Sequence, residues 1–235
     1  MTKGGGGPPG LPRGLRLDGG RSPTLLVTLA SLRGLFLLCA AGGVRTQGLE
    51  LVPPKGPLLV CSNHVSNLDP LLLGARFPRV VHAMAKAEMF RRPLGRAYLE
   101  RCNCFPVRRG LADRTAMRAA LAVLRSGGAL VLFPEGHRSP DQAMQPFEAG
   151  AGYLALRAGV PVVPCAIWGT ELALPIGALV PRRAVIHLRV GEPFLPTSAR
   201  PGEVSREIRG RVAQLLPGAY RGSGNPDQVN GEDEG

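Results

Sequence analysis

The segment NHVSNLDP places His64 at the end of an apolar run and Asp69 five residues later, in front of a proline. A turn from a strand into a helix can fold these two side chains into contact. In such a pair the carboxylate holds one ring N–H, and the other ring nitrogen can accept a proton as a general base. The sequence has no Gly-x-Ser-x-Gly nucleophile, so the base would activate a substrate hydroxyl directly. Taken alone, such a pair is more often a structural histidine beside a helix-capping aspartate.

A second polar turn follows another apolar run, in VLFPEGHRSP. The end of a strand in an α/β sheet is where such proteins place ligands. Arg138 can bind a phosphate through two parallel hydrogen bonds, and Gly136 lets the backbone approach a ligand. Glu135 can accept from a substrate hydroxyl or orient the arginine. The alternative is a surface salt bridge between Glu135 and Arg138 in a tight turn.

Two further segments are candidates for the walls of the same site. In CFPVRRG, the strand-like residues 104–107 precede two arginines. Neighbouring residues of a strand point to opposite faces, so only one of the two enters the site easily, and we expect it to be Arg109. In VPVVPCAIWGT, Pro161 and Pro164 would confine a strand to the sheet edge or place its end close to the pocket. We therefore expect Pro164 in the pocket wall.

Strand and helix patterns alternate from residue 56 onward and place these motifs where strands end. Gly127-Gly128 and Gly159 are positioned to end helices. The alternation predicts an α/β fold in which a largely buried sheet is flanked by helices. Strands are expected over 57–61, 79–85, 104–107, 129–133, 160–167 and 184–190, and helices from Asp69 and over 92–101, 111–126, 147–158 and 202–216.

The charge of the chain predicts an anionic partner. The formal net charge is +12, and residues 76–138 hold 13 Lys or Arg against 4 Asp or Glu. This stretch lacks the interleaved aromatic residues that stack on bases, and it carries no nucleic-acid-binding signature, so we expect no nucleic acid. An anionic lipid surface or a phosphate-bearing small molecule fits the charge, and a solvated arginine-rich face is the alternative.

One catalytic domain with two tails is the expected organisation. We expect a disordered basic arm over 1–22, an apolar membrane-associating segment over 23–47, the catalytic domain over 48–217 and a disordered tail over 218–235. Arg33 lies in the middle of the apolar segment 24–43, which favours a helix in the membrane interface over a span. An export signal is the alternative. The five cysteines are an odd number without framework spacing, which favours a reducing compartment.

The order of the motifs resembles a known family. NHVSNLDP, CFPVRRG, FPEGHRS and VPVVPCAI are similar, in this order, to the four sequence blocks of the glycerolipid acyltransferases, whose type members are 1-acylglycerol-3-phosphate acyltransferases. The resemblance extends over residues 59–170. It implies that family's mixed αβ fold, with an N-terminal membrane-associating helical segment.

The resemblance also assigns roles to residues. It implies His64 and Asp69 as the catalytic pair, and it adds Asn63, Arg109 and Pro164 to the residues around the substrate. It places Arg109 and Arg138 at the acceptor phosphate, with Glu135 to organise them, and it adds Gly136 to the substrate-binding residues. Asn103 stands where the second block usually has Gly, and His137 where the third usually has Thr, so the headgroup site differs from the family pattern.

The implied reaction moves an acyl group from an acyl thioester, carried by coenzyme A or acyl carrier protein, to a lysophospholipid hydroxyl. The expected product from 1-acylglycerol 3-phosphate is phosphatidic acid, made at the cytoplasmic face of the cell membrane without a metal or a bound cofactor. The alternatives are another lysolipid or glycerol 3-phosphate as acceptor, hydrolysis of acyl esters, and a non-catalytic module that binds membranes.

Overall fold

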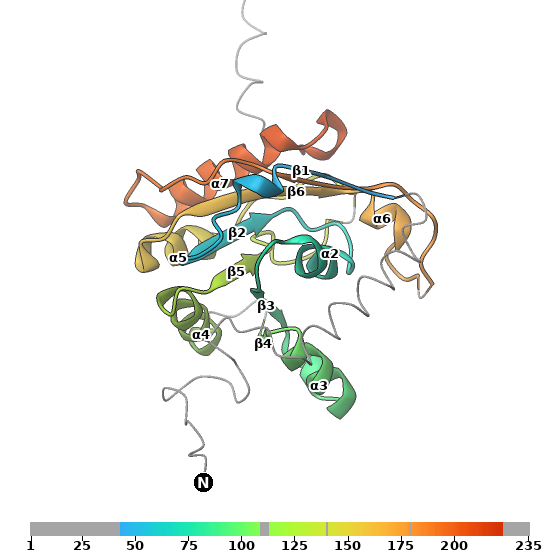
Figure 1. Cartoon of the computed structure of the whole chain (residues 1–235), viewed down its shortest axis with the longest axis horizontal. Helices are drawn as coiled ribbons and strands as arrows, with labels where there is room; N and C mark the ends of the chain where they lie inside the picture. The colour runs from blue at the N-terminus through green and yellow to red at the C-terminus, as the bar shows by residue number, and fades with distance from the viewer. Residues whose placement is uncertain (1–42, 109–112, 140, 179, 223–235) are drawn as a thin grey trace, which may run out of the picture.

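A computed structural model of the chain describes residues 43–108, 113–139, 141–178 and 180–222 (Figure 1). The expected arm over 1–22 and most of the apolar segment over 23–47 lie outside these residues. In chain order, the elements are β1 (Val44–Gln47), η1 (Leu49–Leu51), β2 (Leu58–Ser62), α2 (Asp69–Arg76), β3 (Val81–Lys86), η2 (Ala87–Phe90), α3 (Pro93–Arg101), β4 (Cys104–Val107), α4 (Arg114–Arg125), β5 (Ala129–Leu132), α5 (Gly150–Ala158), β6 (Val162–Trp168), α6 (Thr170–Ala173), β7 (Ile186–Val190), α7 (Pro201–Leu215) and η3 (Gly218–Tyr220).

The strands form a seven-stranded sheet in the order β1-β7-β6-β2-β5-β3-β4. Neighbouring strands run parallel except β6 and β7, which are antiparallel. The carboxyl ends of β2, β3, β5 and β6 therefore meet at one edge, which we call the carboxyl edge. Both polar turns singled out in the sequence follow strands that end there.

Two apolar layers enclose the sheet, because successive residues of a strand point to opposite faces. In β2, Leu59 and Cys61 pack with buried residues of α4, α5 and α7 on one face. Leu58 and Val60 pack with α2 and with Ala173 of α6 on the other face. The expected buried sheet flanked by helices is confirmed.

Each strand and helix expected between residues 57 and 216 is present, with ends that differ by at most three residues. The expected domain limits are too narrow at both ends. Val44–Gln47, assigned to the membrane-associating segment, form the edge strand β1, which pairs with β7. Residues 218–222 were assigned to the tail, but the Tyr220 hydroxyl donates to Glu171 of α6 at 2.8 Å, so this end packs on the domain.

Of the two positions considered for the strand that contains Pro164, the sheet edge is wrong. This strand is β6, which lies inside the sheet between β7 and β2. The pairs Val162–Phe194 and Cys165–Val190 show that its register with the following segment shifts by one residue around Pro164. Such a bulge tolerates a residue without an N–H, and the Pro164 carbonyl still accepts from Gly191 N at 2.9 Å.

Candidate active site

His64 and Asp69 lie in contact on the loop between β2 and α2. The His64 Nδ1 atom lies 2.8 Å from Asp69 Oδ2. The same Oδ2 atom accepts the backbone N–H groups of Val65 and Ser66, each at 2.8 Å. The other oxygen, Oδ1, accepts the hydroxyl of Thr170 at 2.5 Å. Asp69 is fully buried and opens α2, where the helix dipole favours a carboxylate.

These contacts fix the histidine as well as the aspartate. A carboxylate oxygen can only accept, so Nδ1 carries the proton and Nε2 is left as the proton acceptor. The imidazole ring stacks on Phe133, with the ring centroids 4.4 Å apart. His64 is only 5% exposed, yet it lines an apolar pocket beside the loop. The arrangement can remove a proton from a hydroxyl group bound in that pocket.

Glu135 supports the His64 loop from β5. Its carboxylate is buried and accepts His64 N at 2.8 Å, Gln145 N at 2.9 Å and the Ser139 hydroxyl. The Ser139 N–H in turn donates to the His64 carbonyl at 2.9 Å. Burial raises the pKa of Glu135, although these hydrogen bonds act in the opposite direction. The salt bridge from Glu135 to Arg138, which was the alternative interpretation of this turn, is not among the ion pairs of the described residues. Glu135 positions the histidine backbone instead.

Asn63 holds the same loop from the other side. Its side-chain amide donates to the Ile167 carbonyl and accepts the Ile167 N–H, both at 2.8 Å. The amide thus continues the pairing of β2 with β6 beyond Ser62, and it is fully buried. The structure therefore gives Asn63 a positioning role, and its expected contact with substrate stays a prediction.

Two residues in the predicted motifs are explained by backbone conformation. Gly136 has φ +71°, and a Cβ atom there would lie 2.7 Å from Glu148 Oε1. Asn103 has φ +56°, a left-handed conformation that glycine adopts readily and that asparagine tolerates better than most residues. Asn103, which stands where the family usually has glycine, therefore preserves the turn between α3 and β4.

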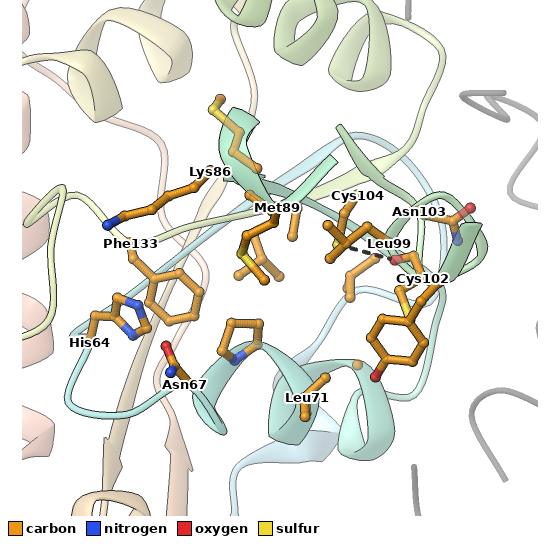
Figure 2. Close-up of a pocket in the computed structure, with 18 of the residues that line it drawn as sticks. His64, Asn67, Leu71, Lys86, Met89, Leu99, Cys102, Asn103, Cys104 and Phe133 are labelled. Atoms are coloured by element: carbon orange, nitrogen blue, oxygen red, sulfur yellow. Dashed lines mark hydrogen bonds between the residues drawn. The ribbon is translucent and has the colours of Figure 1, made fainter. Parts of the chain in front are cut away.

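An apolar pocket of about 460 Å³ extends from His64 between α2, η2 and α3 (Figure 2). Leu71 of α2 lies on one side and Met89 of η2 on the other, and Cys102 and Asn103 lie at the far end from His64. A volume of this size is typical of a site for a small molecule or an extended chain. The apolar part of this pocket, which we call the channel, leads from His64 to Cys102 and Asn103.

Two cationic side chains line the pocket together with His64. One is Arg138, which the sequence predicted, and the other is Lys86, which Figure 2 shows extending over Phe133 on the His64 side. Among the described residues, no carboxylate forms an ion pair with either. The sequence motifs did not identify Lys86. Its position as the last residue of β3 is the signal that could have identified it.

The other predicted residues are distributed differently. Arg109 lies outside the described residues, whereas its neighbour Arg108 is largely exposed and pairs with Asp113, 3.6 Å away. Pro164 is buried in β6 and is not among the residues that line the pocket. Gly136 and His137 line a second hollow of about 660 Å³ between β5, α4 and α5. His64, Asp69 and Arg138 are the predicted residues that the structure gathers at the apolar pocket.

Comparisons with known proteins agree with this geometry. A sequence model described as Acyltransferase matches residues 43–168, which is more than half of the chain. A 1-acyl-sn-glycerol-3-phosphate acyltransferase of Bacillus subtilis is 25% identical over 76% of this chain and 91% of its own length. A lyso-ornithine lipid O-acyltransferase of Pseudomonas aeruginosa is 30% identical over 78% of this chain and 77% of its own length. The crystal structure of the 1-acyl-sn-glycerophosphate acyltransferase PlsC of Thermotoga maritima superposes with a TM-score of 0.69 at 28% identity, covering 81% of this chain and 78% of that one.

Proposed function

We propose that this chain, which belongs to the acyltransferase family, moves a fatty acyl group from an acyl thioester to the free hydroxyl of 1-acylglycerol 3-phosphate and so makes phosphatidic acid. The observation that carries the proposal is the composition of one pocket. It combines the basic nitrogen of His64, two cations without a described ion-pair partner and a long apolar channel. The three match the hydroxyl, the phosphate and the acyl chain of the substrates.

In the proposed reaction, His64 Nε2 takes the proton of the acceptor hydroxyl while the hydroxyl oxygen attacks the thioester carbonyl. The new C–O bond forms, the C–S bond breaks, and the proton passes from His64 to the leaving thiolate. Asp69 keeps the Nδ1 proton in place and stabilises the imidazolium between these steps. No acyl-enzyme is required. The thioester would be carried by coenzyme A or by acyl carrier protein.

Arg138 and Lys86 would hold the acceptor phosphate, and Arg109 is a further candidate from the sequence motif. Arg138 can meet a phosphate with two parallel hydrogen bonds, whereas Lys86 supplies a mobile point charge. Holding the phosphate fixes the hydroxyl relative to His64, and such positioning can contribute several kcal/mol to lowering the barrier. Catalysis then needs no metal, because the residues present supply both the base and the charge.

A second acceptor has an observation in its favour. The relative from Pseudomonas aeruginosa is named for a lyso-ornithine lipid, which has no phosphate, and it is 30% identical to this chain. An acceptor of that kind would use His64 and the apolar channel but would leave the two cations without a phosphate. Glycerol 3-phosphate is the remaining alternative, because it would use the cations and leave the channel to the donor.

The location of the reaction is also proposed. We expect the apolar segment 24–43 to associate with the membrane that holds both lipids, at its cytoplasmic face. In the part of the chain that the structure describes, no helix reaches the length and apolarity of a membrane span. The four described cysteines are free thiols, which fits a reducing compartment.

A panel of acceptors tests the proposal. The protein would be given one labelled acyl thioester and, in turn, 1-acylglycerol 3-phosphate, lyso-ornithine lipid, glycerol 3-phosphate and water alone, with the products identified by mass. We expect phosphatidic acid to form fastest. Faster acylation of the phosphate-free lipid would assign the chain to the second acceptor, and release of free fatty acid without acceptor would make it a hydrolase.

A further inference from the structure

Exposed apolar side chains gather on two segments of the described chain. The first segment, residues 87–101, comprises η2 and α3 and exposes Met89, Leu94 and Tyr98. The second segment, residues 170–178 and 180–183, begins with α6 and exposes Leu172, Ile176 and Val180. We call these two segments the rim. The rim holds six of the nine large apolar side chains that stand exposed in the described residues, and Leu94 reaches 87% exposure. Such side chains are expected to have a partner when they concentrate in one region.

Both segments of the rim lie at the carboxyl edge of the sheet. The first follows β3 directly and the second follows β6 directly, and these strands run parallel within the sheet. Figure 1 shows α3 and α6 on the same side of the sheet edge, with α2 between them. The Ser66 hydroxyl donates to the Leu174 carbonyl at 3.0 Å, which connects the second segment to the His64 loop.

The first segment of the rim lines the apolar pocket, and the second segment contacts the loop that carries His64. Met89 and Tyr98 are at once exposed at the surface and part of the pocket lining, so the pocket opens within the first segment. His64 lines the same pocket from the loop that the second segment contacts. Whatever covers the rim therefore lies next to the point where a lipid would enter.

Arginines accompany the apolar side chains on both segments. The exposed residues include Arg91, Arg92, Arg96 and Arg101 on the first segment and Arg182 and Arg183 on the second. The first segment also carries Glu88 and Glu100, so its formal charge is +4 − 2 = +2. The acidic residue of the second segment, Glu171, is buried and bonded to Tyr220 and Gly169 N. Exposed apolar side chains among arginines are typical of surfaces that insert into the headgroup region of anionic membranes.

We propose that the rim docks the catalytic domain on an anionic bilayer, with the apolar side chains inserted and the arginines at the lipid phosphates. The bilayer is favoured over an acidic protein because the exposed apolar side chains stand on two separate segments, and the first of these also lines the pocket proposed for lipid. The role of this surface rests on the proposed acyl transfer. The surface itself belongs to the described domain and does not include residues 24–43. Lipid could then pass from the bilayer into the pocket without crossing water.

Hydrogen exchange of the full chain on vesicles tests the docking without any substrate. With vesicles of phosphatidylglycerol and phosphatidylcholine, we expect slower exchange in peptides from both rim segments and unchanged exchange in peptides from residues 192–198. Vesicles of phosphatidylcholine alone should give less protection, because the arginines then lack anionic lipid. Equal exchange of the rim with and without anionic vesicles would overturn the proposal, even if residues 24–43 held the chain on the vesicles.

A pair of matched variants gives a second measure. Leu94→Glu should lower partition of the chain onto the anionic vesicles about tenfold. If another segment still holds the chain on the vesicles, the substitution should instead abolish the exchange protection of the first rim segment. Leu195→Glu is the control, since Leu195 is 63% exposed but follows Phe194, which pairs with the first residue of β6 at the opposite edge. Equal effects of the two substitutions would refute the rim. The proposal would also be refuted if the Leu94→Glu variant kept the exchange protection of the rim on vesicles but no longer bound acyl carrier protein. That result would assign the surface to a protein partner.

Because these measurements contain no acceptor or thioester, they are independent of the acyl-transfer assay. Normal docking by a chain that acylates nothing would count against the proposed function alone. Normal acyl transfer by a chain whose rim gains no protection would count against the docking surface alone.

Discussion

The His64–Asp69 pair and the two cations of the pocket differ in how many partners they have within the chain. In the pair, both oxygens of Asp69 accept hydrogen bonds from within the chain, and the His64 backbone is held by Glu135 and Ser139. By contrast, Lys86 is exposed and Arg138 is half-buried, and no described carboxylate pairs with either cation. The base is organised before substrate arrives, whereas the cations depend on the substrate for an anion. One fold can thus keep its chemistry while its acceptor changes.

The largest expected effect comes from removing the base. His64→Ala should lower kcat for acyl transfer at least about 10³-fold, because no other described group in the pocket is placed to take the hydroxyl proton. The fold should persist, since β2 and α2 keep their packing, and the thermal unfolding midpoint should stay within several degrees of the parent. Rates of labelled product formation with saturating substrates measure the effect.

His137→Ala is the matched control for this substitution. His137 is exposed, lines the second hollow and lies outside the pocket of His64. We expect its activity to stay within about threefold of the parent. If His64→Ala retained transfer to any lysolipid, the His64–Asp69 pair would not be the catalytic pair.

Removing a cation should affect binding more than chemistry. Arg138→Ala should raise KM for 1-acylglycerol 3-phosphate about 10- to 100-fold, because a hydrogen-bonded charge pair typically contributes 1.5–3 kcal/mol. A phosphate-free lysolipid should be acylated equally well by the variant and the parent. The control is Arg125→Ala, an exposed arginine in the last turn of α4 that lines neither hollow. An unchanged KM for the phosphorylated acceptor would leave the two cations without their proposed ligand.

The sequence predicted the parts of this site that depend on local order. Strand periodicity placed the ends of β2 and β5 to within one residue, and the spacing from His64 to Asp69 predicted their contact across a strand-to-helix turn. These features follow from steric rules that act over a few residues. The sheet was predicted for the same reason, since alternating patterns of strand and helix leave few other folds.

Contacts between distant segments could not be predicted in the same way. Asn63 appeared to be a candidate for substrate binding because of its motif, but its amide pairs with Ile167, 104 residues away. Glu135 was expected to accept from a substrate hydroxyl or to orient Arg138, three residues on, yet it binds the backbone of His64, which lies 71 residues earlier. The sheet edge, one of two positions considered for β6, is wrong because a bulge in the following segment compensates for Pro164. Each case depends on which strands become neighbours, and periodicity does not specify that.

The smallest expected effect concerns another such distant contact, from Thr170 to Asp69. Thr170 is fully buried at the start of α6, and its hydroxyl donates to Asp69 Oδ1 at 2.5 Å. Thr170→Val keeps the shape of the side chain but removes this donor, while His64, Val65 and Ser66 still hold the other oxygen. We expect kcat to fall about fivefold, equivalent to about 1 kcal/mol, with KM unchanged. Thr170→Ser restores the hydroxyl and should recover most of kcat, although it leaves a small cavity. Loss of stability alone would lower the active fraction of both variants. A serine variant no more active than the valine variant would therefore show that Thr170 contributes only packing and that Asp69 needs no fourth hydrogen-bond donor.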